Sequence, residues 1–189
     1  TAITTGDQNT FVGYAAGDAQ TTAGENTALG YSTLSTNILG SKSTALGWAS
    51  LFYQNPATAV DMYNTAVGHS AGLNVTTGTL NTLIGGLAGD ALTTGGSNVA
   101  VGYFALTTDD VGSKSVAVGT AALGALNYAT ATDGFNVAVG QEAGRQVTTG
   151  INNTLIGAES GDAITDADHN IAVGFRSLST NVLGSRSVA

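Results

Sequence analysis

The sequence predicts an all-β protein, a parallel β-solenoid or β-roll of about eleven coils, each of about 17 residues. Three observations support this fold class. A five-residue phrase, roughly Asn-Thr-Ala-Val-Gly, recurs along the whole chain, and its middle residues alternate in character as a short strand does. Gly occurs 27 times in 189 residues, which argues against helices. Such a unit cannot bury its apolar side chains alone, so stacked coils complete the core.

The glycine that ends each phrase measures the repeat. Two of the gaps between successive glycines are wider than the others, Gly47 to Gly68 and Gly119 to Gly140. Because a wider gap recurs every four coils, the sequence also has a longer period of four coils, which we call the super-repeat. We therefore expect one repeat domain over residues 1–189, a fragment of a longer fibre protein, with super-repeat units 13–84, 85–156 and an incomplete 157–189. The phrase glycines are Gly13, Gly30, Gly47, Gly68, Gly85, Gly102, Gly119, Gly140, Gly157 and Gly174.

Each coil is numbered here from the Asn (or Ser) of its phrase as position 1. Positions 2 to 4 predict a short strand, and the Gly at position 5 ends it where a positive φ or a close backbone approach is required. A small residue follows at position 8 and Gly or Leu at position 9, and Thr-Thr-Gly or a similar turn closes most coils. We expect the Asn side chains at position 1 to form a ladder along a rod of roughly 50 Å.

The predicted strands carry apolar side chains on both faces. Position 4 is aliphatic in every phrase, and position 3 is Ala except for Phe11, Leu83 and Leu155. A strand that is apolar on both faces is buried on both. One face would fill the coil's own interior and the other needs a partner, so we expect a homotrimer, intertwined or side by side. The pattern leaves open which face is intramolecular.

Two successive coils show a family resemblance. Residues 64–80 (NTAVGHSAGLNVTTGTL) and 81–97 (NTLIGGLAGDALTTGGS) resemble the 17-residue repeats of bacteriophage tail-fibre and bacterial surface-fibre proteins. They are also similar to the shorter head repeats of trimeric autotransporter adhesins. The resemblance covers the whole chain and implies a left-handed, trimeric fibre that is extracellular, on a virion or on a cell surface, and that touches a host.

The two four-residue insertions are the candidate ligand-binding loops, because insertions in a solenoid form loops on one face, often the binding face. Exposed aromatic side chains there would stack on sugar rings or anchor a protein. The alternative is that they close a gap in the solenoid or pack between subunits. The aromatic candidates are Trp48, Phe52, Tyr53 and Tyr63 near the first insertion, and Tyr128 and Phe135 near the second.

The charge balance limits the partners. Thirteen acidic residues against five basic ones give a net charge of −8, so the chain cannot offer the clustered bases that nucleic acid or an anionic membrane attracts. No apolar run approaches the roughly 20 residues of a membrane span. The expected partners are further copies of the chain and a host cell-surface glycan or protein. Lys42, Lys114 and Arg186 recur at the same place in each super-repeat, and we expect them to pair with nearby acids rather than to bind an acidic glycan.

The sequence offers few residues that suit catalysis or metal binding. Asp166, Asp168 and His169 form the densest polar cluster, and Asp109 with Asp110 forms a second acidic turn. Hard cations prefer six or more oxygen ligands, so we expect solvated turns and no metal or cofactor. The chain has no Cys and only two His, so we expect no enzyme.

The leading functional prediction is a structural and adhesive fibre segment, the shaft or head of a phage tail fibre or of a bacterial surface adhesin. Two alternatives remain open: an ice-binding Thr-rich solenoid and a self-assembling extracellular filament subunit. Adjacent Thr pairs such as Thr93-Thr94 count against ice binding, because both cannot face outward from one extended strand.

Overall fold

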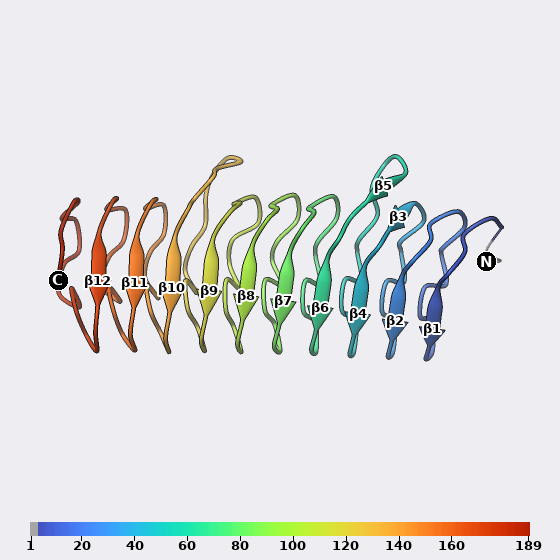
Figure 1. The fold of residues 1–189 in the computed structure, drawn as a ribbon, viewed down its shortest axis with the longest axis horizontal. Helices are drawn as coiled ribbons and strands as arrows, with labels where there is room; N and C mark the ends of the chain where they lie inside the picture. Colours follow the sequence, from blue (N-terminus) through green and yellow to red (C-terminus); the bar gives the residue numbers. More distant parts are fainter. Residues whose placement is uncertain (1–3) are drawn as a thin grey trace.

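The computed structural model describes residues 4–189 and shows a β-solenoid of about ten turns, which confirms the predicted fold class (Figure 1). One strand from each coil joins a ten-stranded parallel sheet, and the described residues contain no helix. Two further strands, β3 (Gly40–Ser41) and β5 (Val60–Asp61), pair with each other beside the first insertion. The main sheet contains β1 (Thr10–Val12), β2 (Thr27–Leu29), β4 (Thr44–Leu46), β6 (Thr65–Val67), β7 (Thr82–Ile84), β8 (Val99–Val101), β9 (Val116–Val118), β10 (Val137–Val139), β11 (Thr154–Ile156) and β12 (Ile171–Val173).

In the main sheet, strand residues pair with the residue at the same position of the neighbouring coil. In β6 and β7, for example, Thr65 pairs with Thr82 and Val67 with Ile84. The insertions do not disturb this register, since Thr44 in β4 pairs with Thr65 in β6 across the first one. The inserted residues therefore lie in loops outside the main sheet.

The structure identifies the intramolecular face. Position 3 points into the coil, where Ala66 and Leu83 are fully buried, and position 12 points into the same core from the opposite layer, where Val75 and Leu92 are fully buried. Because side chains alternate along extended backbone, positions 2 and 4 face outward on the sheet side. Positions 11 and 13 face outward on the other side.

Position 9 adjusts the core to the size of position 3. In the coil with Ala100 at position 3, position 9 is the buried Leu106. Ala66 and Ala138 instead share their coils with Gly72 and Gly144 at position 9. A Cβ at these two glycines would approach the large position 3 residue of the next coil, Leu83 Cδ1 at 2.6 Å or Leu155 Cδ1 at 2.7 Å. Where position 3 is Leu83, Gly lies at position 9 of that coil, and a Cβ there would approach Leu83 Cδ2 to 2.7 Å. The choice between Gly and Leu at position 9 thus depends on volume, although all these residues share a positive φ.

Two columns of contacts run along the rod and join the coils. At Gly68, φ is +140° and a Cβ would lie 2.5 Å from the Gly85 carbonyl oxygen, so both predicted reasons for the phrase glycine hold. The predicted Asn ladder is also present: Asn64 Oδ1 accepts a hydrogen bond from the Asn81 backbone N–H (2.9 Å). Asn64 Nδ2 donates to the Gly78 carbonyl (2.8 Å). Asn64 therefore satisfies a backbone group of its own coil and one of the next.

Candidate functional site

The two insertions form loops that project past the turns of the other coils, one carrying β5 and one between β9 and β10 (Figure 1). Each belongs to a coil whose position 1 is Ser, and an inward side chain of that coil contacts the next Asn. Gln54 Oε1 accepts a hydrogen bond from Asn64 Nδ2 (3.0 Å), and the Tyr128 hydroxyl accepts one from Asn136 Nδ2 (2.9 Å). Each coil with an insertion therefore supplies its own polar link to the ladder.

Tyr128 does not serve as an exposed contact, contrary to its selection as a ligand candidate. Only 4% of its surface is exposed, and its hydroxyl also donates to the Gly150 carbonyl (3.0 Å). The alternative interpretation, in which an aromatic side chain closes a gap in the solenoid, applies to this residue. Burial raises the pKa of Tyr128 well above its ordinary value.

Tyr63 lies beside a lysine at the base of the first loop. Lys42 Nζ is 2.8 Å from Asp61 Oδ2 and 5.4 Å from the centre of the Tyr63 ring. The hydrogen bond to Asp61 raises the pKa of Lys42 above its ordinary value. These contacts fasten the loop to the preceding coil, and about half of the Tyr63 side chain stays exposed.

The second loop repeats this arrangement one super-repeat later. Lys114 Nζ is 2.6 Å from Asp133 Oδ2 and 5.3 Å from the centre of the exposed Phe135 ring. The expected pairing of these lysines with nearby acids is therefore present at both loops. Arg186, the third member of the row, forms no ion pair with another residue of the 4–189 region.

Trp48 belongs to a column of stacked rings that the sequence analysis missed. Its ring centre lies 6.2 Å from that of Tyr31 and 4.7 Å from that of His69, with nearly parallel planes, and Tyr14 extends the stack beyond Tyr31 at 5.1 Å. The four rings occupy position 6 of successive coils. Their recurrence directly after four successive phrase glycines would have revealed them.

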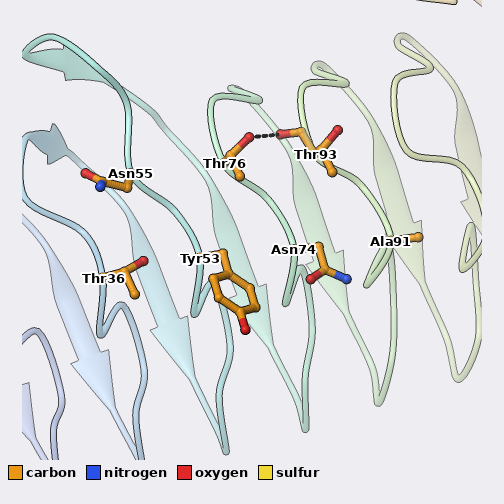
Figure 2. Close-up of a pocket in the computed structure, with 7 residues that line it drawn as sticks. All are labelled: Thr36, Tyr53, Asn55, Asn74, Thr76, Ala91 and Thr93. Atoms are coloured by element: carbon orange, nitrogen blue, oxygen red, sulfur yellow. Dashed lines mark hydrogen bonds between the residues drawn. The ribbon is translucent and has the colours of Figure 1, made fainter.

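Trp48, Phe52 and Tyr53 do come together, around a hollow that residues at positions 6, 7, 10 and 11 line. This first hollow has a volume of about 410 Å³. A second, more open hollow of about 640 Å³ adjoins it and also includes Tyr53 (Figure 2). We call the two together the Tyr53 groove. The first is lined by Tyr31, Ser32, Trp48, Ala49, Phe52, Tyr53 and Leu73, and the second by Thr36, Tyr53, Asn55, Asn74, Thr76, Ala91 and Thr93.

The next super-repeat contains a counterpart of the first hollow without its aromatic platform. At the places of Trp48, Phe52 and Tyr53 it has Thr120, Gly124 and Ala125. The counterpart hollow has a volume of about 330 Å³ and is bordered by Arg145. Since the same coil backbone forms with small residues, the solenoid does not require the three aromatic side chains.

The carboxylates of the turn that contains Asp166 and Asp168 accept hydrogen bonds from neighbouring groups. Asp168 Oδ1 accepts a hydrogen bond from the Ile151 N–H (2.8 Å), and Asp166 Oδ1 accepts one from the Thr165 hydroxyl (3.2 Å). Across residues 4–189, no three His, Asp or Glu side chains converge in the manner of metal ligands. The same region contains no helix of the length and apolar character that a membrane crossing needs.

The stacked coils place the chain among the β-solenoid repeat proteins. No protein-family model, curated protein or solved structure matches it. The similarity to fibre repeats therefore rests on the repeated phrases of the sequence.

Proposed function

We propose that the chain is a rigid structural and adhesive segment of an extracellular, virion or cell-surface fibre, and that it assembles with two further copies of itself. The feature that supports this proposal is the outward face of the ten-stranded sheet. There, position 4 gives an unbroken aliphatic row, and no other part of the described chain lies across it. The row contains Val12, Leu29, Leu46, Val67, Ile84, Val101, Val118, Val139, Ile156 and Val173.

The extent of this row argues for a protein partner. Side chains at its two ends, Val12 and Val173, are 55% and 57% exposed, and Ile84 in the middle is 39% exposed. Ten coils spaced by about 4.8 Å make a strip about 43 Å long. Monomeric soluble proteins rarely expose a continuous apolar strip of this size.

A second copy of the same chain is the partner that matches this strip in length and spacing. Rods that lie side by side present aliphatic rows with the same spacing, and three such faces around a common axis bury all three rows. The resemblance to trimeric fibre repeats supports the number three. The larger hollow of the Tyr53 groove lies on the opposite layer and would stay accessible in such a trimer, so three copies of a weak contact would act together.

The molar mass in solution tests the assembly. Light scattering on a size-exclusion column should give three times 18.7 kDa for the wild-type chain. Ile84→Glu places a charge in the row and should yield monomers. Leu80→Glu is the matched control, because Leu80 is 55% exposed but lies in a turn outside the sheet face. A monomeric wild type, or equal masses for both variants, would contradict the proposal, and a mass that grows with concentration would favour the filament alternative.

A row of threonines on the same face favours the ice-binding alternative as a second candidate. Thr10, Thr27, Thr44, Thr65 and Thr82 occupy position 2 of five successive strands in parallel register. In β8, β9 and β10 the row changes to Val99, Val116 and Val137, and in β11 it returns to Thr154. Thermal hysteresis measured on a monomeric sample would support ice binding, and its loss in Thr65→Lys would assign it to this row.

A further inference from the structure

We propose that the Tyr53 groove binds a linear, uncharged oligosaccharide that lies along the rod axis. This inference gives a chemical class to the attachment role proposed above and rests on that role. It concerns a different face from the one assigned to assembly. The argument uses the length of the groove, its charge, its free polar groups, its aromatic ring and its counterpart in the next super-repeat.

The larger hollow is elongated in the direction of the rod. Its lining comes from four successive coils, beginning at Thr36 and ending at Thr93, and uses only positions 11 and 13 of each coil. Three coil spacings of about 4.8 Å give a trough about 14 Å long. A linear polymer of pyranose rings repeats at a similar spacing, so successive rings would meet successive coils.

The chemistry of the lining favours an uncharged polar ligand. None of the seven residues that line the larger hollow is charged, although the chain carries a net charge of −8. Thr76 Oγ1 donates to the Thr93 carbonyl (3.1 Å), which is the one side-chain hydrogen bond among the residues drawn in Figure 2. Asn55 Oδ1 accepts the Ile38 N–H (3.3 Å), while its amide N–H groups remain available for a ligand.

Asn74 adds a second carboxamide in the neighbouring coil. In the 4–189 region its side chain makes no hydrogen bond to another residue, and it lies beside Tyr53 (Figure 2). A carboxamide both donates and accepts, which suits the adjacent hydroxyls of a sugar. Asn55 and Asn74 would therefore bind hydroxyl groups of successive rings.

Tyr53 supplies the platform on which a sugar ring can stack. Its side chain is 48% exposed, and Phe52 meets it edge to face at a centroid distance of 4.7 Å, which holds the ring in place. Trp48 has the same exposed fraction, but its faces are turned toward Tyr31 and His69. Trp48 therefore borders the groove with its edge, and Tyr53 is the residue that we expect to stack on the ligand.

The internal repeat shows that this platform is additional to what folding needs. The counterparts of Tyr53, Asn55 and Asn74 are Ala125, Asn127 and Gln146. The polar positions thus keep a carboxamide while the aromatic ring is missing, and Arg145 replaces the neutral Leu73. We therefore assign binding to the groove of residues 36–93 and not to its counterpart.

A glycan array that carries uncharged and anionic oligosaccharides is the first test, followed by titration of the bound glycans. Trp48 is the only tryptophan and borders the groove, so its fluorescence should report binding. Tyr53→Ala should lower the affinity about tenfold or more, and Asn74→Ala by roughly threefold to tenfold. Tyr53→Ala reproduces the residue of the counterpart coil, and circular dichroism should show an unchanged fold.

Tyr103→Ala is the control, because Tyr103 is a 52% exposed aromatic residue outside the groove. The glycan affinity of this variant should equal that of the wild type. The proposal is overturned if no uncharged glycan binds, if anionic glycans bind better, or if Tyr53→Ala binds as well as Tyr103→Ala. If the wild-type chain has the mass of a trimer but binds no uncharged glycan, this inference alone is refuted. A monomer that still binds glycans refutes the assembly alone.

Discussion

Asp109 occupies the same place in its coil as Asn37 does one super-repeat earlier, and each side chain accepts a hydrogen bond at 3.0 Å from the backbone N–H of the glycine that follows it in the turn, Gly112 or Gly40. Asn37 Nδ2 also donates to the Gly40 carbonyl (2.7 Å). Asp109 Oδ2 is buried and has no hydrogen-bond partner within residues 4–189. The place that holds an amide donor at Asn37 therefore holds a carboxylate at Asp109, which has no donor when it is ionised.

Asp109→Asn should stabilise the protein by about 1–2 kcal/mol at neutral pH, because it restores the missing donor. Burial raises the pKa of Asp109 above its ordinary value of 3.8. The wild type therefore loses stability as the pH rises from 3.8 through the raised value, and the variant lacks this loss. Urea unfolding as a function of pH measures the difference. The exposed Asp110→Asn removes the same charge and should change little; an equal gain in both variants would refute the explanation.

Asn81→Ala should destabilise the rod by about 2–4 kcal/mol, because two buried backbone groups lose their partner. The substitution removes the acceptor of the Asn98 N–H (3.0 Å) and the donor to the Gly95 carbonyl (2.9 Å). Thermal unfolding followed by circular dichroism gives the cost. Asn74→Ala is the comparison, since that half-buried side chain makes no hydrogen bond in the described region, and a similar cost for both would contradict the role of the ladder.

Leu83 and Gly89 should show strong energetic coupling. Leu83→Ala leaves a cavity and costs about 2–4 kcal/mol, while Gly89→Leu alone places a Cβ 2.7 Å from Leu83 Cδ2. The double variant reproduces the Ala100 and Leu106 arrangement of the next coil. We expect it to be less destabilised than the sum of the single variants by about 1–3 kcal/mol in a double-mutant cycle. Additive costs would show that the two positions do not share one volume.

Trp48→Ala should lower the free energy of unfolding by about 1–2 kcal/mol, because it removes a ring that contacts neighbours on both sides. The fold should persist, since Thr120 occupies this place in the next super-repeat. Urea unfolding gives the value. Tyr103→Ala serves for comparison, because Tyr103 contacts the Phe104 ring and no ring of another coil within residues 4–189, so its cost should be smaller.

The strands were predictable because each one coincides with the middle of the repeated phrase. Residues 65–67 show the period-two alternation of a strand, and β6 covers Thr65–Val67. The pairing of strands also follows from the regular spacing of the phrases. Which apolar face lies inside did not follow, because Ala66 and Val67 are both apolar. The volume match between Leu83 and Gly89 decides it, and it becomes visible only once the coils are stacked.

The candidate site was predictable in part. Tyr53 and Tyr128 are both aromatic residues of insertion coils, yet Tyr53 is 48% exposed and Tyr128 only 4%. Tyr53 precedes the inserted residues and keeps its place at position 11, beside the inward Gln54 at position 12. Tyr128 lies in the inserted part of its coil, where the position number no longer predicts whether a side chain points into the core or outward. The polar half of the groove comes from residues such as Asn74, which no motif distinguishes in the sequence.

The uninterrupted register across both insertions also bears on how such a rod changes its length. One super-repeat adds four coils, or about 19 Å, and joins at either end to the same columns of backbone hydrogen bonds, Asn side chains and phrase glycines. Duplication or deletion of one unit in the gene therefore alters the length by a fixed step without a new junction to optimise. Each added unit also carries its own hollow at the place of the Tyr53 groove, where substitutions on the outward positions can create a new specificity while the older one is kept.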